Sequence, residues 1–220
     1  MYEIIPSPGT NNKDWAEMEK KIELVKPFSR TIHIDVVDGK FAPHTTFADP
    51  APFVKYTQNT PASENSLLFE VHLMVDEPIN HLQRWADAGF HRFIGHVEKM
   101  SDQVAFVAAA QHFGEVGLAL DKQTSIDGIT IDLENLDTVL VMTIQAGHSG
   151  QLFEEDLLQK VEKLSQQTSI PIEVDGGIND ETISIAAAHG ASRFVATSFL
   201  YNLQTPQQQY DLLKKELKIR

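Results

Sequence analysis

The sequence contains no cysteine. Disulfide bonds, thiolate zinc sites and cysteine nucleophiles are therefore excluded. It also has no uninterrupted apolar run approaching the roughly 20 residues that a membrane-spanning helix needs. The first residues, MYEIIPSPGTNNKDW, include neither a basic segment nor an apolar stretch of the length found in signal peptides. We therefore expect a soluble cytoplasmic protein.

Basic residues are scarce, since 18 Lys and Arg stand against 31 Asp and Glu, for a formal net charge of -13. At long range this charge repels nucleic acid and anionic membrane surfaces, so neither is expected as a partner. A small anionic ligand remains compatible, because backbone amides at a helix N-terminus bind phosphate whatever the global charge. A chain of 220 residues, 42% of them hydrophobic, can bury one full core, and we expect a single domain over residues 1–220.

The chain does contain a regular alternation of two kinds of segment. Short apolar runs typical of strands are each followed by a stretch typical of a helix, and the pattern occurs eight times. The expected strands are Glu3–Pro6, Thr31–Val36, Leu67–Val75, Arg92–Val97, Val116–Leu120, Thr138–Thr143, Ile170–Val174 and Phe194–Thr197. The expected helices lie near residues 14–25, 49–56, 78–89, 102–113, 126–131, 154–167, 180–189 and 206–218. Eight βα units predict a closed (β/α)8 TIM barrel.

A doubly wound open sheet is the alternative fold, because it shares the βα alternation. Such sheets usually have fewer strands and often carry a Gly-rich phosphate loop after the first strand. Here the first strand leads into Pro6-Ser7-Pro8-Gly9 instead, which favours the barrel. The stretch at 57–66 is interpreted as an ordinary surface loop.

Polar residues at the C-terminal ends of barrel strands are the candidates for chemistry. His33 and Asp35 are two residues apart on the second strand, so both side chains point to the same face. His72 lies on the third expected strand, and Asp175 ends the seventh, directly before Gly176-Gly177. A single histidine in an apolar strand is more often an ordinary core residue with a hydrogen-bond partner. Two imidazoles and two carboxylates in one apolar mouth, however, require compensation of their buried charge. A divalent ion provides it, and this mixed set of ligands suits zinc, iron, manganese or cobalt better than calcium.

Ordered motifs along nearly the whole chain resemble one known family. They are Ile5-Pro6-Ser7, His33-Ile34-Asp35-Val36-Val37-Asp38-Gly39, Phe41-Ala42-Pro43, Thr46-Phe47, Val71-His72-Leu73-Met74-Val75, His96-Val97-Glu98, Met142-Thr143, Gly147, Gly150-Gln151 and Glu173-Val174-Asp175-Gly176-Gly177-Ile178-Asn179. The family is that of the ribulose-phosphate 3-epimerases, which are ribulose-phosphate-binding barrels. Motifs in order on successive strands are far more specific than any one of them alone.

The resemblance implies that one divalent metal ion, Zn, Fe(II), Mn or Co, is bound by His33, Asp35, His72 and Asp175. It also implies that Asp35 and Asp175 are the catalytic acid and base, that the substrate is a small phosphorylated sugar, and that the protein forms a homo-oligomer. Backbone amides after strands six to eight would hold the phosphate. The implied substrate-binding residues are Ser7, His72, Met74, Met142, Gly147, His148, Ser149, Gly150, Gly176, Gly177, Thr197 and Ser198. For Met74 and Met142, core packing is an equally good interpretation.

Departures from the family pattern gather on the substrate side. The family usually has glycine at 197, where the branched side chain of Thr197 would limit the approach of a phosphate to the backbone. The other departures are Val37 for methionine, His44 for asparagine, Pro8-Gly9-Thr10 for Ile-Leu-Ser, Asp121-Lys122 for Asn-Pro, and Ala146, His148 and Ser149 for proline, phenylalanine and glycine.

These departures leave alternatives to the reaction at carbon 3 of ribulose 5-phosphate. One is an epimerase of a six-carbon ketose phosphate such as allulose 6-phosphate, and another is a non-catalytic homologue that binds metal or sugar phosphate. Aldol cleavage or decarboxylation is disfavoured, because both chemistries usually need a lysine at a strand end. Here only Lys40 and Lys122 come near, in the loops just beyond.

Overall fold

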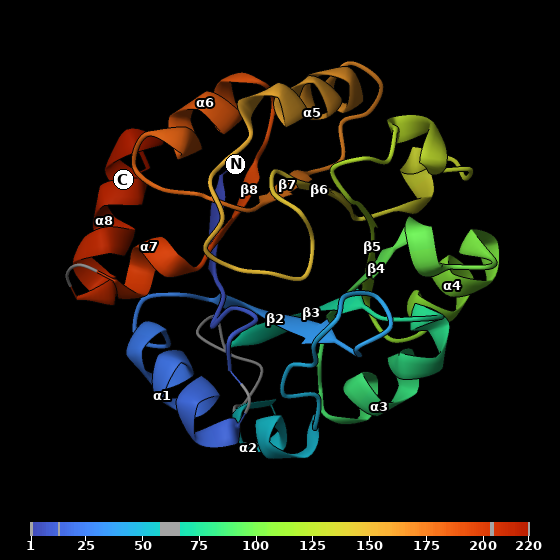
Figure 1. Cartoon of the computed structure of the whole chain (residues 1–220), viewed down its shortest axis with the longest axis horizontal. Coiled ribbons are helices and arrows are strands. Elements are labelled where there is room, and N and C mark those ends of the chain that lie inside the picture. The colour runs from blue at the N-terminus through green and yellow to red at the C-terminus, as the bar shows by residue number, and fades with distance from the viewer. Residues whose placement is uncertain (1, 13, 58–66, 203–204, 220) are drawn as a thin grey trace.

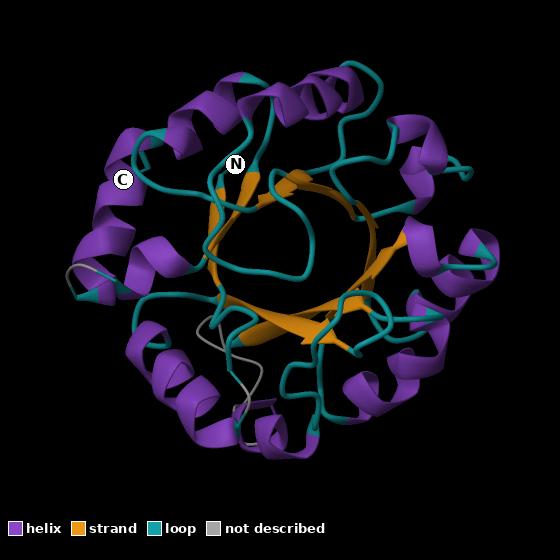
Figure 2. Ribbon diagram, viewed as in Figure 1, coloured by secondary structure: helices purple, strands orange, loops and turns teal. Residues whose placement is uncertain are grey.

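A computed structural model describes residues 2–12, 14–57, 67–202 and 205–219. Within them eight parallel strands surround a central axis and helices cover the outside (Figures 1 and 2), which confirms the predicted barrel. Hydrogen-bonded ladders join the strands in the order β1-β8-β7-β6-β5-β4-β3-β2, and β1 lies beside β2, so the sheet is nearly closed. The strands are β1 Glu3–Pro6, β2 Thr31–Val37, β3 Leu68–Met74, β4 Arg92–His96, β5 Glu115–Leu120, β6 Thr138–Met142, β7 Ile172–Asp175 and β8 Arg193–Ala196.

The outer layer consists of α-helices and short 3-10 turns. The helices are α1 Trp15–Val25, α2 Val54–Thr57, α3 Leu82–Asp87, α4 Gln103–Ala110, α5 Leu158–Ser165, α6 Thr182–Ala188, α7 Ser198–Tyr201 and α8 Pro206–Glu216. The 3-10 turns are Ala51–Phe53, Pro78–His81, Val97–Lys99, Ile126–Gly128, Leu133–Asn135 and Glu155–Leu157. Among the described residues, none of these helices has the length and apolar character needed to cross a bilayer.

Local sequence explains several helix starts. Asp14 accepts a hydrogen bond from the Glu17 amide at the start of α1. Thr205 and Gln208 form a reciprocal capping box at the start of α8, with Pro206 in the first helical position. These side chains satisfy amides that lack a partner inside the helix.

The outer layer differs from expectation in two places, one wrong helix and one additional helix. The helix expected at 126–131 is replaced by two 3-10 turns, in which Ser125 and Asp132 accept hydrogen bonds from amides two residues ahead. Such local bonds favour turns over a continued helix. The short helix α7, directly after β8, was not expected at all. The loop expected at 57–66 begins inside α2 at Thr57, and its remaining residues lie outside the described part.

Strand register brings the polar residues of the interior together. Asp35 lies opposite His72 and His33 opposite Glu70 in the β2–β3 ladder, while Met142 lies opposite Asp175 in the β6–β7 ladder. Because side chains alternate along a strand, His33 and Asp35 both face inward at successive levels. The mouth of the barrel therefore receives polar groups from three strands.

Candidate active site

The four residues expected to bind a metal ion meet at the C-terminal end of the barrel. His33 and Asp35 come from β2, His72 from β3 and Asp175 from the end of β7. One ligand atom of each lies within 4.8 Å of those of the others, and all four residues are buried.

Close contacts define which atoms face the centre of this group. Nε2 of His33 lies 3.2 Å from Oδ1 of Asp35, and Nδ1 of His72 lies 3.1 Å from the same oxygen. Nδ1 of His72 also lies 3.7 Å from Oδ2 of Asp175. Two imidazole nitrogens and two carboxylates thus converge without a basic side chain between them. This donor set fits a divalent transition-metal ion.

The pKa values of the Asp35 and Asp175 carboxyl groups are shifted in opposite directions in the metal-free protein. Burial alone would raise the pKa of Asp35, but the charge and hydrogen bond of His33, with the hydrogen bond of His72, hold it far below its usual range. Burial, followed by the charge of Asp35, raises the pKa of Asp175 to about 8. One carboxyl group is therefore ionised at neutral pH while the other holds a proton, which is the division that an acid and base pair requires.

A buried ionic network supports His33 from below. Its Nδ1 lies 2.6 Å from Oε1 of Glu70 and 3.5 Å from Glu173. Arg92 donates to Glu70 and also, at 2.6 Å, to Glu115. Burial and the charge of Glu70 raise the pKa of Glu173 to about 7. Because Nδ1 of His33 faces Glu70, its Nε2 is the nitrogen that faces the four-residue cluster.

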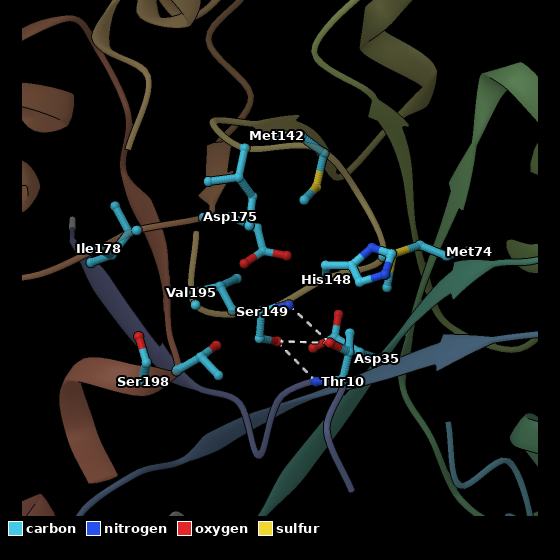
Figure 3. A pocket seen from close by; sticks show the side chains of 16 residues that line it. Thr10, Asp35, Met74, Met142, His148, Ser149, Asp175, Ile178, Val195 and Ser198 are labelled. Atoms are coloured by element: carbon cyan, nitrogen blue, oxygen red, sulfur yellow. Dashed lines mark hydrogen bonds between the residues drawn. The ribbon is translucent and has the colours of Figure 1, made fainter. Parts of the chain in front are cut away.

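A small pocket of about 20 Å³ opens above the cluster (Figure 3). The carboxylates of Asp35 and Asp175 both enter it. The structure brings most of the expected substrate-binding residues to its wall, namely Met74, Met142, Gly147, His148, Ser149, Gly150, Gly176, Gly177, Thr197 and Ser198.

Two residues predicted to bind substrate lie behind the wall of the cavity. The Ser7 hydroxyl is fully buried and donates to Oδ2 of Asp35 at 2.8 Å, so it holds the carboxylate. His72 likewise lies behind Asp35 and Asp175 and is fully buried. In this structure Ser7 therefore orients one residue of the cluster, and His72 is itself one of its four residues.

The segment 145–151 crosses the mouth of the barrel, drawn in yellow in Figure 1, and is joined to the loop after β1. The Thr10 amide donates to Oγ of Ser149 at 2.9 Å, and the Ser149 amide donates to Oγ1 of Thr10 at 2.9 Å. The two hydroxyl oxygens are 3.0 Å apart, and Figure 3 shows these bonds at the edge of the cavity. We call this pair the Thr10–Ser149 clasp.

Thr197 is accommodated by a second departure from the family pattern. A Cβ atom at Gly9 would lie only 2.6 Å from Cγ2 of Thr197, so the threonine methyl group occupies space that a larger residue at position 9 would need. Gly9 also has φ +81°, which favours glycine. The methyl group packs against the β1 loop, in space that the absence of a side chain at position 9 leaves open.

Sequence reasoning missed several residues of this wall. Ile144, Ile178 and Val195 line the cavity as apolar neighbours of the strand ends, and Thr10 was noted only as a departure. The rings of His44 and His148 lie 4.4 Å apart between their centroids. Their positions near strand ends could have indicated that Ile144 and Val195 line the cavity. The contact between His44 and His148 could not be predicted, because it joins two loops far apart in sequence.

Fold and site together define a class of protein, a (β/α)8-barrel enzyme with a buried His and Asp cluster at the catalytic end. KGPDC from Streptococcus mutans has the same fold, with a TM-score of 0.71 at 14% identity over 99% of this chain and 97% of that chain. The 3-keto-L-gulonate-6-phosphate decarboxylase from Vibrio cholerae matches with a TM-score of 0.69, also at 14% identity and with the same coverage. At such identities the likeness concerns the fold alone.

Sequence comparison identifies the family. The profile of the ribulose-phosphate 3 epimerase family matches residues 7–201. The ribulose-phosphate 3-epimerase of Schizosaccharomyces pombe is 34% identical over 205 residues, covering 92% of this chain and 89% of the yeast protein. That of Candida glabrata is 32% identical and covers 99% and 94%. The chain belongs to the ribulose-phosphate 3-epimerase family, and it is an isomerase of the carbohydrate epimerase class.

Proposed function

We propose that the protein is a metal-dependent epimerase that inverts carbon 3 of a ketose phosphate and interconverts D-ribulose 5-phosphate and D-xylulose 5-phosphate. The observation that carries the proposal is the convergence of His33, Asp35, His72 and Asp175 at one end of a cavity. The names of the S. pombe and C. glabrata relatives support the choice of substrate.

Inversion of a carbon next to a carbonyl needs a base on one face of the substrate and an acid on the other. Asp35 and Asp175 come from β2 and β7 and flank the cavity, so they suit these roles. One of the two carboxylates takes the proton from carbon 3, and the other, as a carboxylic acid, delivers a proton to the opposite face. Ser7 keeps Oδ2 of Asp35 oriented by its hydrogen bond. A divalent ion bound by the four residues would supply positive charge beside the developing enediolate oxygens.

The phosphate end of the substrate would lie against the loops after β6, β7 and β8. That part of the cavity is lined by Gly147 to Gly150, Gly176-Gly177 and Thr197-Ser198, whose backbone amides would hold the phosphate. Backbone amides bind phosphate without a lysine or arginine. Met74 and Met142 line the wall near the reacting carbons and limit the access of water.

The lysines near the barrel mouth do not support aldol or decarboxylase chemistry. Nζ of Lys40 lies 3.1 Å from Asp76, and Nζ of Lys122 lies 3.0 Å from Glu154, both in ion pairs near the surface. Neither lysine is among the residues that line the cavity. A Schiff base requires an amine that reaches the substrate carbonyl.

Three further features remain proposals. We propose that residues 1–220 form a single barrel domain, that the enzyme acts in the cytoplasm, and that it assembles as a homo-oligomer. A rice relative named as a cytoplasmic isoform of ribulose-phosphate 3-epimerase supports the second of these.

The test is hydrogen exchange at the substrate carbon. Metal-loaded protein is incubated with ribulose 5-phosphate in heavy water, and deuterium at carbon 3 is followed by NMR. We expect deuterium incorporation together with xylulose 5-phosphate, and neither in the metal-stripped control. Absence of exchange with bound metal would overturn the choice of substrate, and allulose 6-phosphate would be tested next. Absence of exchange with both sugars would favour the non-catalytic alternative.

A further inference from the structure

The imidazole of His72 is contacted at both nitrogens, and only one of them faces the cluster. Its Nδ1 lies near Asp35 and Asp175, whereas Nε2 lies 2.8 Å from Nε2 of His96. The rings of His72 and His96 are 4.9 Å apart between centroids and inclined by only 24°. His96 lies at the end of β4, which neighbours β3 in the sheet.

The second ring nitrogen of His96 is also occupied. Its Nδ1 lies 2.9 Å from Oε2 of Glu98, and the ring packs against Phe41 with centroids 4.6 Å apart. His96 is fully buried, whereas Glu98 is partly exposed at the rim. The other carboxylate oxygen of Glu98 accepts the amide of Asp121 at 2.7 Å. A continuous line of hydrogen-bonding groups therefore runs from the cluster through His72 and His96 to the rim.

The direction of these hydrogen bonds follows from the last acceptor. Glu98 is a partly exposed carboxylate that accepts the Asp121 amide, and an ionised carboxylate can only accept from Nδ1 of His96. Nδ1 of His96 must then carry a proton, and a neutral imidazole has its lone pair on the other nitrogen. Nε2 of His96 accepts from Nε2–H of His72. The lone pair of His72 is thereby on Nδ1, directed at the cluster.

We propose that His96 and Glu98 are positioning residues, which fix the tautomer and ring orientation of His72 so that its Nδ1 can bind a metal ion. The inference rests on the proposed function, because it assumes that the four-residue cluster binds metal. It adds a role for the His96-Val97-Glu98 motif, to which the reaction itself assigns none. Partners of this kind typically contribute about 10- to 100-fold in metal affinity.

Two variants of His96 separate this role from simple packing. His96→Phe keeps an aromatic ring against Phe41 but removes the acceptor for His72. His96→Gln keeps an amide oxygen that can accept from His72 and an amide group that can donate to Glu98. If His96 only filled space, the phenylalanine variant would bind metal as well as the natural protein does.

The measurement is a Co(II) titration of metal-free protein, followed by visible absorption and by calorimetry. We expect about 10- to 100-fold weaker binding for His96→Phe, with an altered Co(II) spectrum, and affinity close to that of the natural protein for His96→Gln. Glu98→Gln is the variant that tests the positioning role if His96→Phe does not fold. Its neutral amide cannot enforce one tautomer, so a smaller loss of affinity is expected. Thermal unfolding of each metal-free variant reports whether it is folded.

The outcomes separate the inference from the function on which it rests. Unchanged Co(II) affinity in folded His96→Phe or Glu98→Gln, with normal binding by the natural protein, overturns the positioning role and leaves the proposed function intact. Failure of the natural protein itself to bind Co(II) overturns the metal dependence, and the positioning role with it.

Discussion

The two ends of the cavity, which are proposed to bind the metal ion and the phosphate and are called the metal end and the phosphate end, are built in different ways. The metal end is made of side chains on β2, β3 and β7, whose spacing is fixed by ladder hydrogen bonds and a buried ionic network. The phosphate end is made of loops, in which the Thr10–Ser149 clasp joins segments 139 residues apart. All four expected metal ligands match the family pattern, whereas the departures other than Val37 lie in the loops.

This difference follows from the physics of the two kinds of support. A residue on a strand is held in place by the hydrogen bonds of its ladder, so its side chain cannot easily be repositioned. Exchanging one of the four buried ligands would also leave a buried charge uncompensated. A loop can adjust its backbone, and one change can be offset by another nearby. Gly9 and Thr197 are such a pair, because the methyl group of one lies where a side chain of the other would be. Departures at the phosphate end are therefore coupled, and we expect them to preserve binding.

The largest effect is expected from Asp175→Asn at the metal end. Loss of a proton donor and acceptor should lower kcat by about 10²- to 10⁴-fold. Binding of inorganic phosphate, which reports on the other end of the cavity, should change little. Steady-state kinetics measures the loss of kcat, and calorimetry measures the binding of inorganic phosphate. Turnover close to that of the natural protein would remove Asp175 from the reaction.

The next largest effect is expected on stability, from the packing of Thr197 against Gly9. Gly9→Ala should lower the free energy of unfolding by about 2–4 kcal/mol, from backbone strain at positive φ plus overlap with the methyl group. Gly150→Ala is the matched control, since Gly150 also has positive φ but a Cβ atom there would meet no other atom within 4 Å. Adding Thr197→Ser to Gly9→Ala should recover about 1 kcal/mol. Denaturant unfolding measures all four proteins, and equal losses at the two glycines would argue against the coupling.

A third prediction concerns the pH dependence of stability of the metal-free protein. The pKa of Asp175 is raised to about 8 and that of Glu173 to about 7, whereas unfolded carboxyl groups titrate near pH 4. Between pH 6.5 and 8 the folded state thus holds more protons, so its stability falls as pH rises. The raised pKa of His33 acts in the same direction, whereas the lowered pKa of His72, at about 4, opposes it slightly until unfolded histidine has lost its proton, near about pH 7.5.

The expected loss over this window is about 2 kcal/mol from Asp175 alone. Urea unfolding at a series of pH values measures it. Asp175→Asn should flatten the profile, and added Co(II) should reverse the loss, because metal binds the ionised carboxylate. A stability that rises between pH 6.5 and 8 would contradict the assignment.

The smallest effect is expected at the clasp. Thr10→Val keeps the shape of the side chain but removes the hydroxyl, and Thr10→Ser keeps the hydroxyl. The valine variant should bind inorganic phosphate about fivefold more weakly, since lost hydrogen bonds cost about 1 kcal/mol. The serine variant should resemble the natural protein, and Co(II) affinity should be unchanged in both. A parallel loss of Co(II) affinity would show that the two ends are not independent.

Much of the barrel and the ligand set could be predicted from the sequence. Residues two apart on a strand share a face whatever surrounds them, so His33 and Asp35 could be paired from their spacing alone. The βα alternation predicts the order of strands, and strand order places His72 and Asp175 at the same end of the barrel. These inferences rest on local periodicity, which the chain carries in its own residues.

Only the tertiary structure decided how these residues are supported. The contacts of His33 with Glu70, of His72 with His96, and of Thr10 with Ser149 join different strands or loops. No local pattern indicates which ring nitrogen faces a carboxylate, or that Gly9 makes room for Thr197. The contacts between strands depend on which strands pair in the sheet. The contact of Gly9 with Thr197 depends on the closure of the barrel, because only closure brings the last strand and its loop beside the first.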